Sequence, residues 1–276
     1  MNHSKIVERI KEYGCCKVDN FLDEKNLELI DKILKNRVLE KKIGKNDLDT
    51  YFYRDRDKNF LLKKIIKLNF SFFFDCLKLI KLSKQLKLNI LADKILSSKS
   101  KLHTIDSYFS PKSDKPVLDW HLDQAYSGKV NVNNYLNPDH AALKFFIYLT
   151  PVSYENGCLG YIPGSNKIAY YLKKGIFEGE LAYKPYWTLR DFRNLVQEKN
   201  YHTYIQKYVD SNELELFFDN TAFVENGYKQ NKDFFNKLDR GGAIIFDESG
   251  AHIGSKPSKN DRLVLRYSYK VENYKE

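Results

Sequence analysis

Hydrophobic and polar residues recur with a helical spacing in the first hundred residues of the chain. Apolar side chains return there every three or four positions, between lysines, as in an amphipathic helix. One short apolar run among them has instead the length of a strand. The pattern predicts a helix over 4–14, a strand over 15–18, a helix beginning at Asp23 and Glu24, and two more helices within 58–97.

After about residue 100 the pattern changes to short β-prone runs, separated by Gly, Pro, Asn and Asp. Between these runs, residues 166–240 are rich in Tyr, Phe and charge, which predicts mixed helix and loop. An interval of that length inside a compact β domain is usually a functional lid or an insertion. The β-prone runs predict strands over 102–109, 142–149, 158–162, 242–247 and 262–271.

These elements predict a single domain over residues 1–276, of the α+β class, mainly β with supporting helices. Residues 1–100 would form the helical support, residues 101–165 and 241–276 a barrel or jelly-roll core, and residues 166–240 the insertion or lid. Hydrophobic residues make up 42% of the chain and aromatic residues 14%, which suffices for a sizeable core with an aromatic-lined pocket.

The sequence contains no uncharged apolar run of about 18 residues, so we expect no transmembrane helix. Residues 1–14 are charged and lack the apolar stretch of a signal peptide. The four cysteines form no CxxC pair, and we expect them to be reduced in a cytoplasmic protein. They are Cys15, Cys16, Cys76 and Cys158.

The net charge of +10 is concentrated in the first part of the chain. Residues 1–116 contain 26 Lys and Arg against 16 Asp and Glu, whereas the remaining residues are balanced. This excess could face nucleic acid, anionic lipid or an acidic substrate. We favour a lysine-rich solvated surface, because charge runs usually only keep a surface wet, and do not expect a nucleic-acid partner.

His121 and Asp123 form a His-x-Asp pair at the expected end of a strand. In a strand, residues i and i+2 point to the same face, so both side chains can reach one ion. His252 follows the apolar strand 242–247 and is the best candidate for a third ligand. Two imidazoles and one carboxylate form the facial triad of non-haem iron(II) oxygenases, with positions open for a co-substrate and dioxygen. A structural zinc site would instead be closed by four protein ligands.

A His-x-Asp pair alone is weak support for a metal site, because an isolated histidine is more often a hydrogen-bonded structural residue. The other histidines provide an internal comparison, since none of them has a carboxylate two residues later. These are His3, His103, His140 and His202.

Arg262 lies ten residues after His252, on a strand where Val264 and Arg266 would share its face. A guanidinium inside a barrel needs a partner, because burying it unpaired costs several kcal/mol. A dicarboxylate co-substrate would supply that partner through a bidentate contact. The alternatives are an internal Asp or Glu as the partner of Arg262, and Arg266 as the competing anchor.

Four segments resemble, in the same order, the phytanoyl-CoA dioxygenase-like (PhyH) family of Fe(II)/2-oxoglutarate-dependent oxygenases. The most specific is the Asn-Gly segment 155–165, which follows the expected strand 142–149. Many members have His after the Pro-Gly-Ser of this segment, whereas this chain has Asn166, so a substrate contact at that position is not carried over. The four segments are Tyr13–Asp23, Trp120–Gln124, Glu155–Ser165 and Gly242–Arg262.

The resemblance implies a double-stranded β-helix of the jelly-roll or cupin type. It also implies that His121, Asp123 and His252 bind iron and that Arg262 binds the 5-carboxylate of 2-oxoglutarate. Phe146 would line the co-substrate pocket, and Lys144 and Tyr148 would share its face.

The expected function is therefore an Fe(II)/2-oxoglutarate-dependent dioxygenase that hydroxylates a small molecule and releases succinate and carbon dioxide. An anionic or carrier-linked substrate would suit the basic N-terminal part. Halogenating relatives replace the ligand carboxylate with a small residue, so the presence of Asp123 favours hydroxylation. Gln124, Tyr126 and Tyr154 are the candidate substrate contacts.

Two other functions remain compatible with these residues. A non-catalytic, cupin-like barrel could bind nucleic acid or another anionic partner through a basic face. A metal-dependent isomerase or hydrolase could use the same three ligands without oxygen, although Arg262 argues against it.

Overall fold

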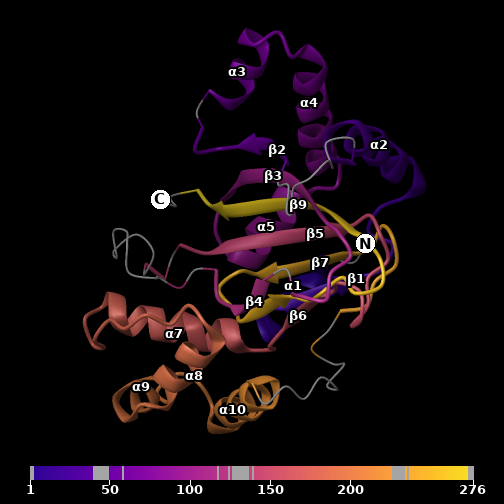
Figure 1. The fold of residues 1–276 in the computed structure, drawn as a ribbon. Coiled ribbons are helices and arrows are strands. Elements are labelled where there is room, and N and C mark those ends of the chain that lie inside the picture. The colour runs from indigo at the N-terminus through magenta and orange to yellow at the C-terminus, as the bar shows by residue number, and fades with distance from the viewer. Residues whose placement is uncertain are drawn as a thin grey trace.

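The fold combines two antiparallel sheets with two groups of helices (Figure 1). The computed structural model describes residues 3–39, 50–57, 59–116, 118–123, 125, 137–138, 140–225, 234 and 236–272. The expected α+β class with a jelly-roll core is confirmed, because the two sheets enclose a common apolar interior. That interior contains Phe146 and Phe246 of the larger sheet and Leu159 and Tyr161 of the smaller one.

The larger sheet has six strands, and all its neighbouring strands are antiparallel. Its residues alternate between the two faces, as side chains in a strand must. Their order in space is β1 (Cys15–Val18), β7 (Ala243–Asp247), β5 (Ala142–Tyr148), β9 (Arg262–Val271), β3 (Ser100–Ser110) and β2 (Thr50–Arg54).

The smaller sheet has three short antiparallel strands. The central strand carries one histidine of the expected triad and an outer strand carries the other. Their order is β4 (Leu118–His121), β8 (His252–Gly254) and β6 (Leu159–Tyr161).

Helices of the N-terminal part cover the outer face of the larger sheet. Ile105, Phe145, Leu265 and Tyr267 point to that side and pack with the apolar faces of the helices. The helices on this side are α1 (His3–Tyr13), α2 (Glu24–Leu34), α3 (Phe60–Ile66), α4 (Phe70–Gln85), α5 (Leu88–Leu96) and the π-helix η1 (Lys35–Leu39).

A second group of helices lies beside the smaller sheet, at the lower side of Figure 1. These helices share an apolar cluster of their own, to which Leu122, Ile162 and Ala251 contribute from the segments next to the smaller sheet. The group consists of α7 (Ser165–Phe177), α8 (Leu189–Gln197), α9 (Lys199–Ile205) and α10 (Ser211–Glu225).

The structure differs from the expected elements in three places. Residues 60–96 form three helices rather than two, because Leu68 and Lys87 take left-handed backbone angles that interrupt the segment. Strands β2 and β8 were not expected. Strand β4 ends at His121, so Asp123 lies in the following turn rather than in a strand.

The four cysteines are unpaired thiols in the structure. Within the described residues, no helix combines the length and the apolar character needed to cross a membrane.

Candidate metal centre

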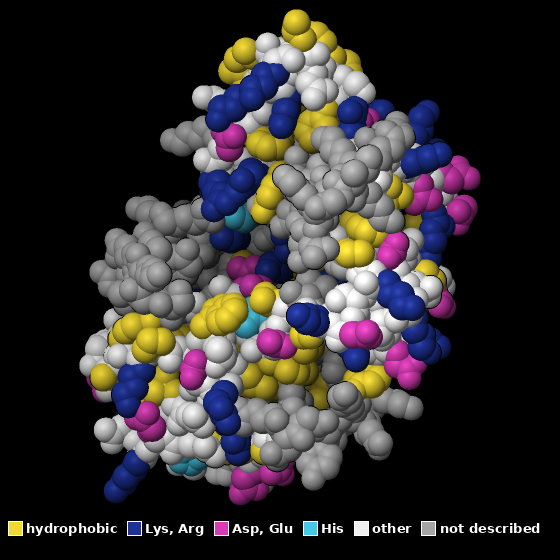
Figure 2. Space-filling model, in the orientation of Figure 1, with side chains coloured by type: hydrophobic (Ala, Val, Ile, Leu, Met, Phe, Trp, Pro, Cys, Tyr) yellow, Lys and Arg dark blue, Asp and Glu magenta, His cyan; other side chains and the backbone are white. Residues whose placement is uncertain are grey.

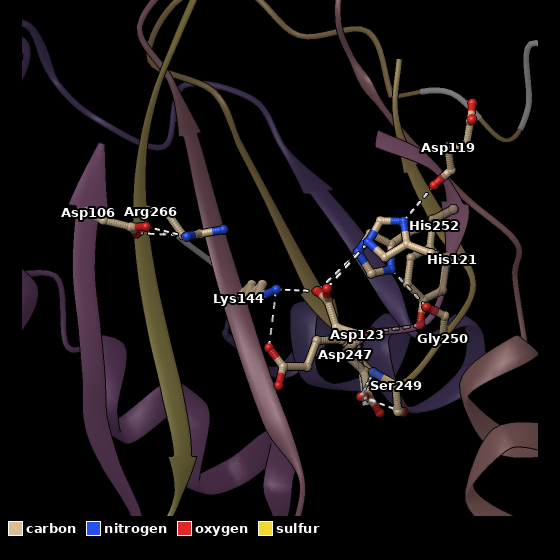
Figure 3. Close-up of polar contacts among 12 residues, drawn as sticks. Asp106, Asp119, His121, Asp123, Lys144, Asp247, Ser249, Gly250, His252 and Arg266 are labelled. Atoms are coloured by element: carbon tan, nitrogen blue, oxygen red, sulfur yellow. Dashed lines mark hydrogen bonds and ion pairs between the residues drawn. The ribbon is translucent and has the colours of Figure 1, made fainter. Parts of the chain in front are cut away.

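Two histidines face each other across the smaller sheet. His121 is the last residue of β4, His252 is the first residue of β8, and the two are directly paired in the antiparallel register. Their ring centroids lie 4.3 Å apart, and both side chains are buried. The turn after β4 then returns Asp123 to the same point, so that three side chains converge there (Figure 3).

The orientation of both imidazoles is fixed by backbone carbonyls. The Nδ1 atom of His121 lies 2.6 Å from the Asp119 carbonyl oxygen, and that of His252 lies 2.9 Å from the Gly250 carbonyl oxygen. If each Nδ1–H donates to its carbonyl, each Nε2 keeps a lone pair directed at the common point. The backbone therefore selects the tautomer that a metal ligand requires.

The donor atoms of the three side chains fit a first-row metal ion. The Nε2 atoms of His121 and His252 lie 3.3 and 3.2 Å from the carboxylate oxygens of Asp123. One ligand atom from each residue can be chosen so that all three lie within 4.8 Å of one another. Two neutral imidazoles and a carboxylate on one side are the donor set of a facial triad.

A buried lysine neutralises this carboxylate. Lys144, on β5, forms an ion pair with Asp123 and a second one with Glu248, at 3.3 Å (Figure 3). Burial opposes ionisation of Asp123, but the Lys144 ammonium and His252 outweigh it and hold the pKa of Asp123 well below its usual range. Asp123 is therefore a carboxylate, as a metal ligand must be. Burial opposes the charge of Lys144 too, and its two acidic partners nonetheless raise its pKa.

The three side chains open into a cavity of about 320 Å³ between the two sheets. Figure 2 shows a hollow in this face, with acidic, basic and histidine side chains inside it. Beyond the triad, the cavity is lined by Tyr108, Leu118, Lys144, Phe146, Leu159, Gly254, Arg262 and Arg266.

Arg262 is a wall of this cavity and is only 1% exposed. Its Nη1 donates to the Gly157 carbonyl at 2.7 Å and its Nη2 donates to the Ser110 hydroxyl at 3.1 Å. The guanidinium also lies over the Tyr108 ring, 5.2 Å from the centroid. Its Nε is buried without a hydrogen-bond partner, and no carboxylate of the described residues forms an ion pair with this side chain. The cavity wall thus contains a buried cation that has no anionic partner among the residues that the structure describes.

Arg266 has the internal partner that Arg262 lacks. Its guanidinium makes two hydrogen bonds to Asp106, which is fully buried, one of them from Nε at 2.8 Å (Figure 3). The register of β3 and β9 places these two residues directly opposite each other. Internal pairing, which the sequence left open for Arg262, therefore occurs at Arg266, the residue considered as the competing anchor.

Two glycines leave the space that the side chains of Arg262 and Tyr161 occupy. Gly157 has φ +72°, and a Cβ there would lie 2.9 Å from Cδ of Arg262. A Cβ at Gly250 would overlap the Tyr161 hydroxyl. These contacts give physical reasons for the Asn-Gly segment before β6 and for the glycine two residues before His252.

The remaining expected residues divide into three groups. Phe146 and Lys144 line the cavity. Tyr148 is buried deeper in the interior, where its hydroxyl accepts a hydrogen bond from the Leu159 amide, and Tyr154 is not among the lining residues. Gln124 and Tyr126 lie outside the described residues.

Sequence reasoning missed Tyr108, Ser110 and Glu248. Tyr108 and Ser110 are two residues apart on β3 and share one face, so extending the argument used for β9 to this strand would have found them. Glu248 follows β7 directly and had no comparable signal.

A model of the family described as phytanoyl-CoA dioxygenase (PhyH) matches residues 10–257 of the chain. No curated protein sequence is similar enough to count as a match. Solved structures with a similar fold include two enzymes of nogalamycin biosynthesis. The first is the non-haem α-ketoglutarate-dependent carbocyclase SnoK, with a TM-score of 0.59, 12% identity and coverage of 97% of this chain and 83% of that one.

The second is the epimerase SnoN in complex with Fe³⁺, α-ketoglutarate and nogalamycin RO, with a TM-score of 0.54, 13% identity and coverage of 98% and 83%. HygX from Streptomyces hygroscopicus, with nickel and 2-oxoglutarate bound, has a TM-score of 0.52, 12% identity and coverage of 98% and 87%. At these identities the similarity concerns the fold.

Proposed function

Because the chain belongs to the phytanoyl-CoA dioxygenase (PhyH) family, we propose that it is an Fe(II)- and 2-oxoglutarate-dependent dioxygenase that oxidises a small molecule, most simply by hydroxylation. The observation that carries this proposal is the convergence of His121, Asp123 and His252, with both imidazoles oriented by backbone carbonyls. Solved structures of similar fold contain iron or nickel together with 2-oxoglutarate, which supports the same pair of cofactors for this chain.

In this proposal His121, Asp123 and His252 hold the iron. Bound iron(II) and 2-oxoglutarate would supply the oxidising chemistry, using dioxygen and releasing succinate and carbon dioxide. The contribution of the chain is to orient two imidazoles through backbone carbonyls and to keep one carboxylate ionised. Lys144 serves this purpose, because its charge favours the ionised form of Asp123 while Glu248 retains the ammonium at the cavity wall.

Arg262 is the proposed partner of the 5-carboxylate of 2-oxoglutarate. It lines the same cavity as the triad, it is buried, and it has no carboxylate partner among the described residues. An incoming carboxylate would offset the cost of burying this guanidinium. Tyr108 and Phe146, whose rings pack edge to face at 6.1 Å, would form the apolar wall that excludes water from the co-substrate.

The proposal is tested by measuring succinate formed from 2-oxoglutarate by iron-reconstituted protein, with candidate substrates supplied from metabolite extracts. We expect turnover that requires oxygen and iron and that falls at least about a hundredfold in His252→Ala, because the remaining ligands cannot complete the triad. His202→Ala, which removes an imidazole from α9, is the matched control and should retain full activity.

Succinate formation that is equal in His252→Ala and wild type would contradict the assignment of the site. Oxygen-independent turnover of a substrate would point instead to a metal-dependent isomerase or hydrolase. A non-catalytic binding module would neither bind iron stoichiometrically nor consume 2-oxoglutarate.

A further inference from the structure

A second cavity, of about 170 Å³, adjoins the metal cavity. The two share Lys144 and Arg266 as lining residues, so one begins where the other ends. In Figure 2, lysine, arginine and histidine side chains gather at the upper rim of the central hollow. The second cavity is therefore adjacent to the metal centre.

Its lining is strongly cationic. Glu248 is the only carboxylate among the described residues that line it. The positively charged or titratable basic side chains are Arg54, Arg56, His103, Lys144, Arg266 and Lys270.

The acidic residues close to this cavity are largely engaged elsewhere. Asp55 pairs with Lys101 at 2.8 Å, and Asp57 pairs with Lys63 at 2.9 Å, both away from the lining residues. Asp106 is bound to Arg266, and Glu248 shares Lys144 with Asp123. These carboxylates are therefore paired with basic residues other than Arg54.

The cavity follows a single row of residues across the larger sheet. Arg54 on β2 pairs in register with Thr104 on β3, Thr104 with Ser268 on β9, and Ser268 with Lys144 on β5. At the usual spacing of strands, the backbones of Arg54 and Lys144 are roughly 14 Å apart. Two small hydroxyl side chains separate the two cations, which leaves space above them and provides hydrogen-bond donors.

Arg54 has a buried side-chain donor that no described residue accepts from. Its guanidinium lies over the Tyr51 ring, 4.2 Å from the centroid, which holds the side chain in place. Its Nε is buried and has no hydrogen-bond partner among the described residues. A buried donor left without an acceptor costs free energy that an oxygen of a ligand would recover.

We propose that this cavity binds an oxyanionic group of the substrate, anchored by Arg54 within the cationic lining, while the carbon to be oxidised lies at the triad. The inference rests on the proposed function, because it assigns the role of the neighbouring cavity to the same substrate. Guanidinium groups bind phosphate, sulfate and carboxylate through paired hydrogen bonds, and Thr104 and Ser268 add neutral donors. The small volume admits one such group and not the backbone of a nucleic acid.

The test titrates the nickel- and 2-oxoglutarate-loaded protein with methyl phosphate, sulfate and acetate in separate calorimetric experiments. Occupying the metal centre beforehand leaves few positions open on the metal, and a parallel titration of the metal-free protein excludes binding to the metal. We expect saturable binding of at least one anion, weakened about tenfold or more in Arg54→Gln because a charge-assisted contact is lost. Arg190→Gln removes the same charge from an exposed position on α8 and should bind as wild type does.

Two further measurements separate loss of the contact from loss of the fold. Arg54→Lys retains the charge and should bind the anion more tightly than Arg54→Gln does. The affinity for 2-oxoglutarate should be unchanged in Arg54→Gln and reduced in Arg262→Gln, which distinguishes the two anion sites.

Equal anion affinity in wild type and Arg54→Gln would overturn the inference. If the protein bound no 2-oxoglutarate, the proposed function would fail. The anion titration can be made on the metal-free protein as well and would still report on the cationic cavity.

Discussion

At the scale of single residues, the metal centre depends on contacts that repeat between its two histidines. Each imidazole is paired with the carbonyl oxygen of the residue two positions earlier, Asp119 for His121 and Gly250 for His252. A backbone acceptor does not depend on the identity of its side chain, so no sequence motif reports it. Glycine is required at 250 for a different reason, because Tyr161 occupies the space of a Cβ.

Gly157→Ala should destabilise the fold and weaken 2-oxoglutarate binding. A left-handed backbone angle costs an alanine about 1–2 kcal/mol, and at this position the new Cβ would also press on Arg262. Gly179→Ala is the matched control, since φ is +80° there and nothing lies within 4 Å of the added Cβ. Urea unfolding should show a loss in both variants, whereas the KM for 2-oxoglutarate should rise only in Gly157→Ala. An unchanged KM in both would mean that the glycine does not serve the Arg262 site.

At the scale of elements, the two faces of strand β9 have different surroundings. One face packs against the N-terminal helices, and the other lines the metal cavity. Leu263, Leu265 and Tyr267 pack under the N-terminal helices, and the Tyr267 hydroxyl donates to the Leu79 carbonyl of α4 at 3.1 Å. Arg262 and Arg266 point to the opposite side, into the metal cavity. The prediction from alternation, that Arg262, Val264 and Arg266 share one face of this strand, is confirmed.

Leu265→Ala should lower the free energy of unfolding by about 2–5 kcal/mol, because the side chain is fully buried on the helix-facing side. Metal binding by the folded variant should stay as in wild type. Denaturant unfolding and iron content, measured on the same preparations, test both statements. Loss of iron from a fully folded variant would show that the two faces are coupled.

Helix α7 contains a lysine that is buried away from the metal centre. Burial lowers the pKa of Lys173 to about 8, although Asp247 and Glu248 partly offset the effect. The unfolded chain, with an ordinary lysine pKa, binds more protons than the folded chain between about pH 8 and 10.4. Stability contributed at this position therefore rises with pH over that window.

Lys173→Met should lose this pH dependence. The free energy of unfolding of wild type should increase relative to the variant by on the order of 1–2 kcal/mol between pH 7.5 and 9.5. Urea titrations at the two pH values measure the difference, with the exposed Lys199→Met as the control that shows no such change. A difference that is the same at both pH values would mean that Lys173 is charged in the folded protein.

At the scale of the whole molecule, sequence predicted the strands of the core and the class of fold, because alternation and turn residues are local signals. Strands β2 and β8 were not predicted, because β2 is an edge strand and β8 has only three residues. Sequence also did not predict that Arg266 has an internal carboxylate partner whereas Arg262 has none among the described residues. This difference depends on the register that sets Asp106 opposite Arg266, and that register joins segments about 160 residues apart.

The role of the basic N-terminal part also depends on pairing between strands, which local sequence signals do not predict. This part was interpreted as a solvated surface, yet pairing of β2 with β3 brings Arg54 to a cavity next to the metal centre. The roles assigned to His121, Asp123, His252 and Arg262 remain predictions, and the geometry described above is their support.

Anaerobic titration with iron(II) tests the central claim most directly. The account predicts one tightly bound iron per chain in wild type, no tight site in His121→Ala, Asp123→Ala or His252→Ala, and a normal site in His202→Ala. Iron binding of equal stoichiometry and affinity in wild type and in all three ligand variants would contradict it.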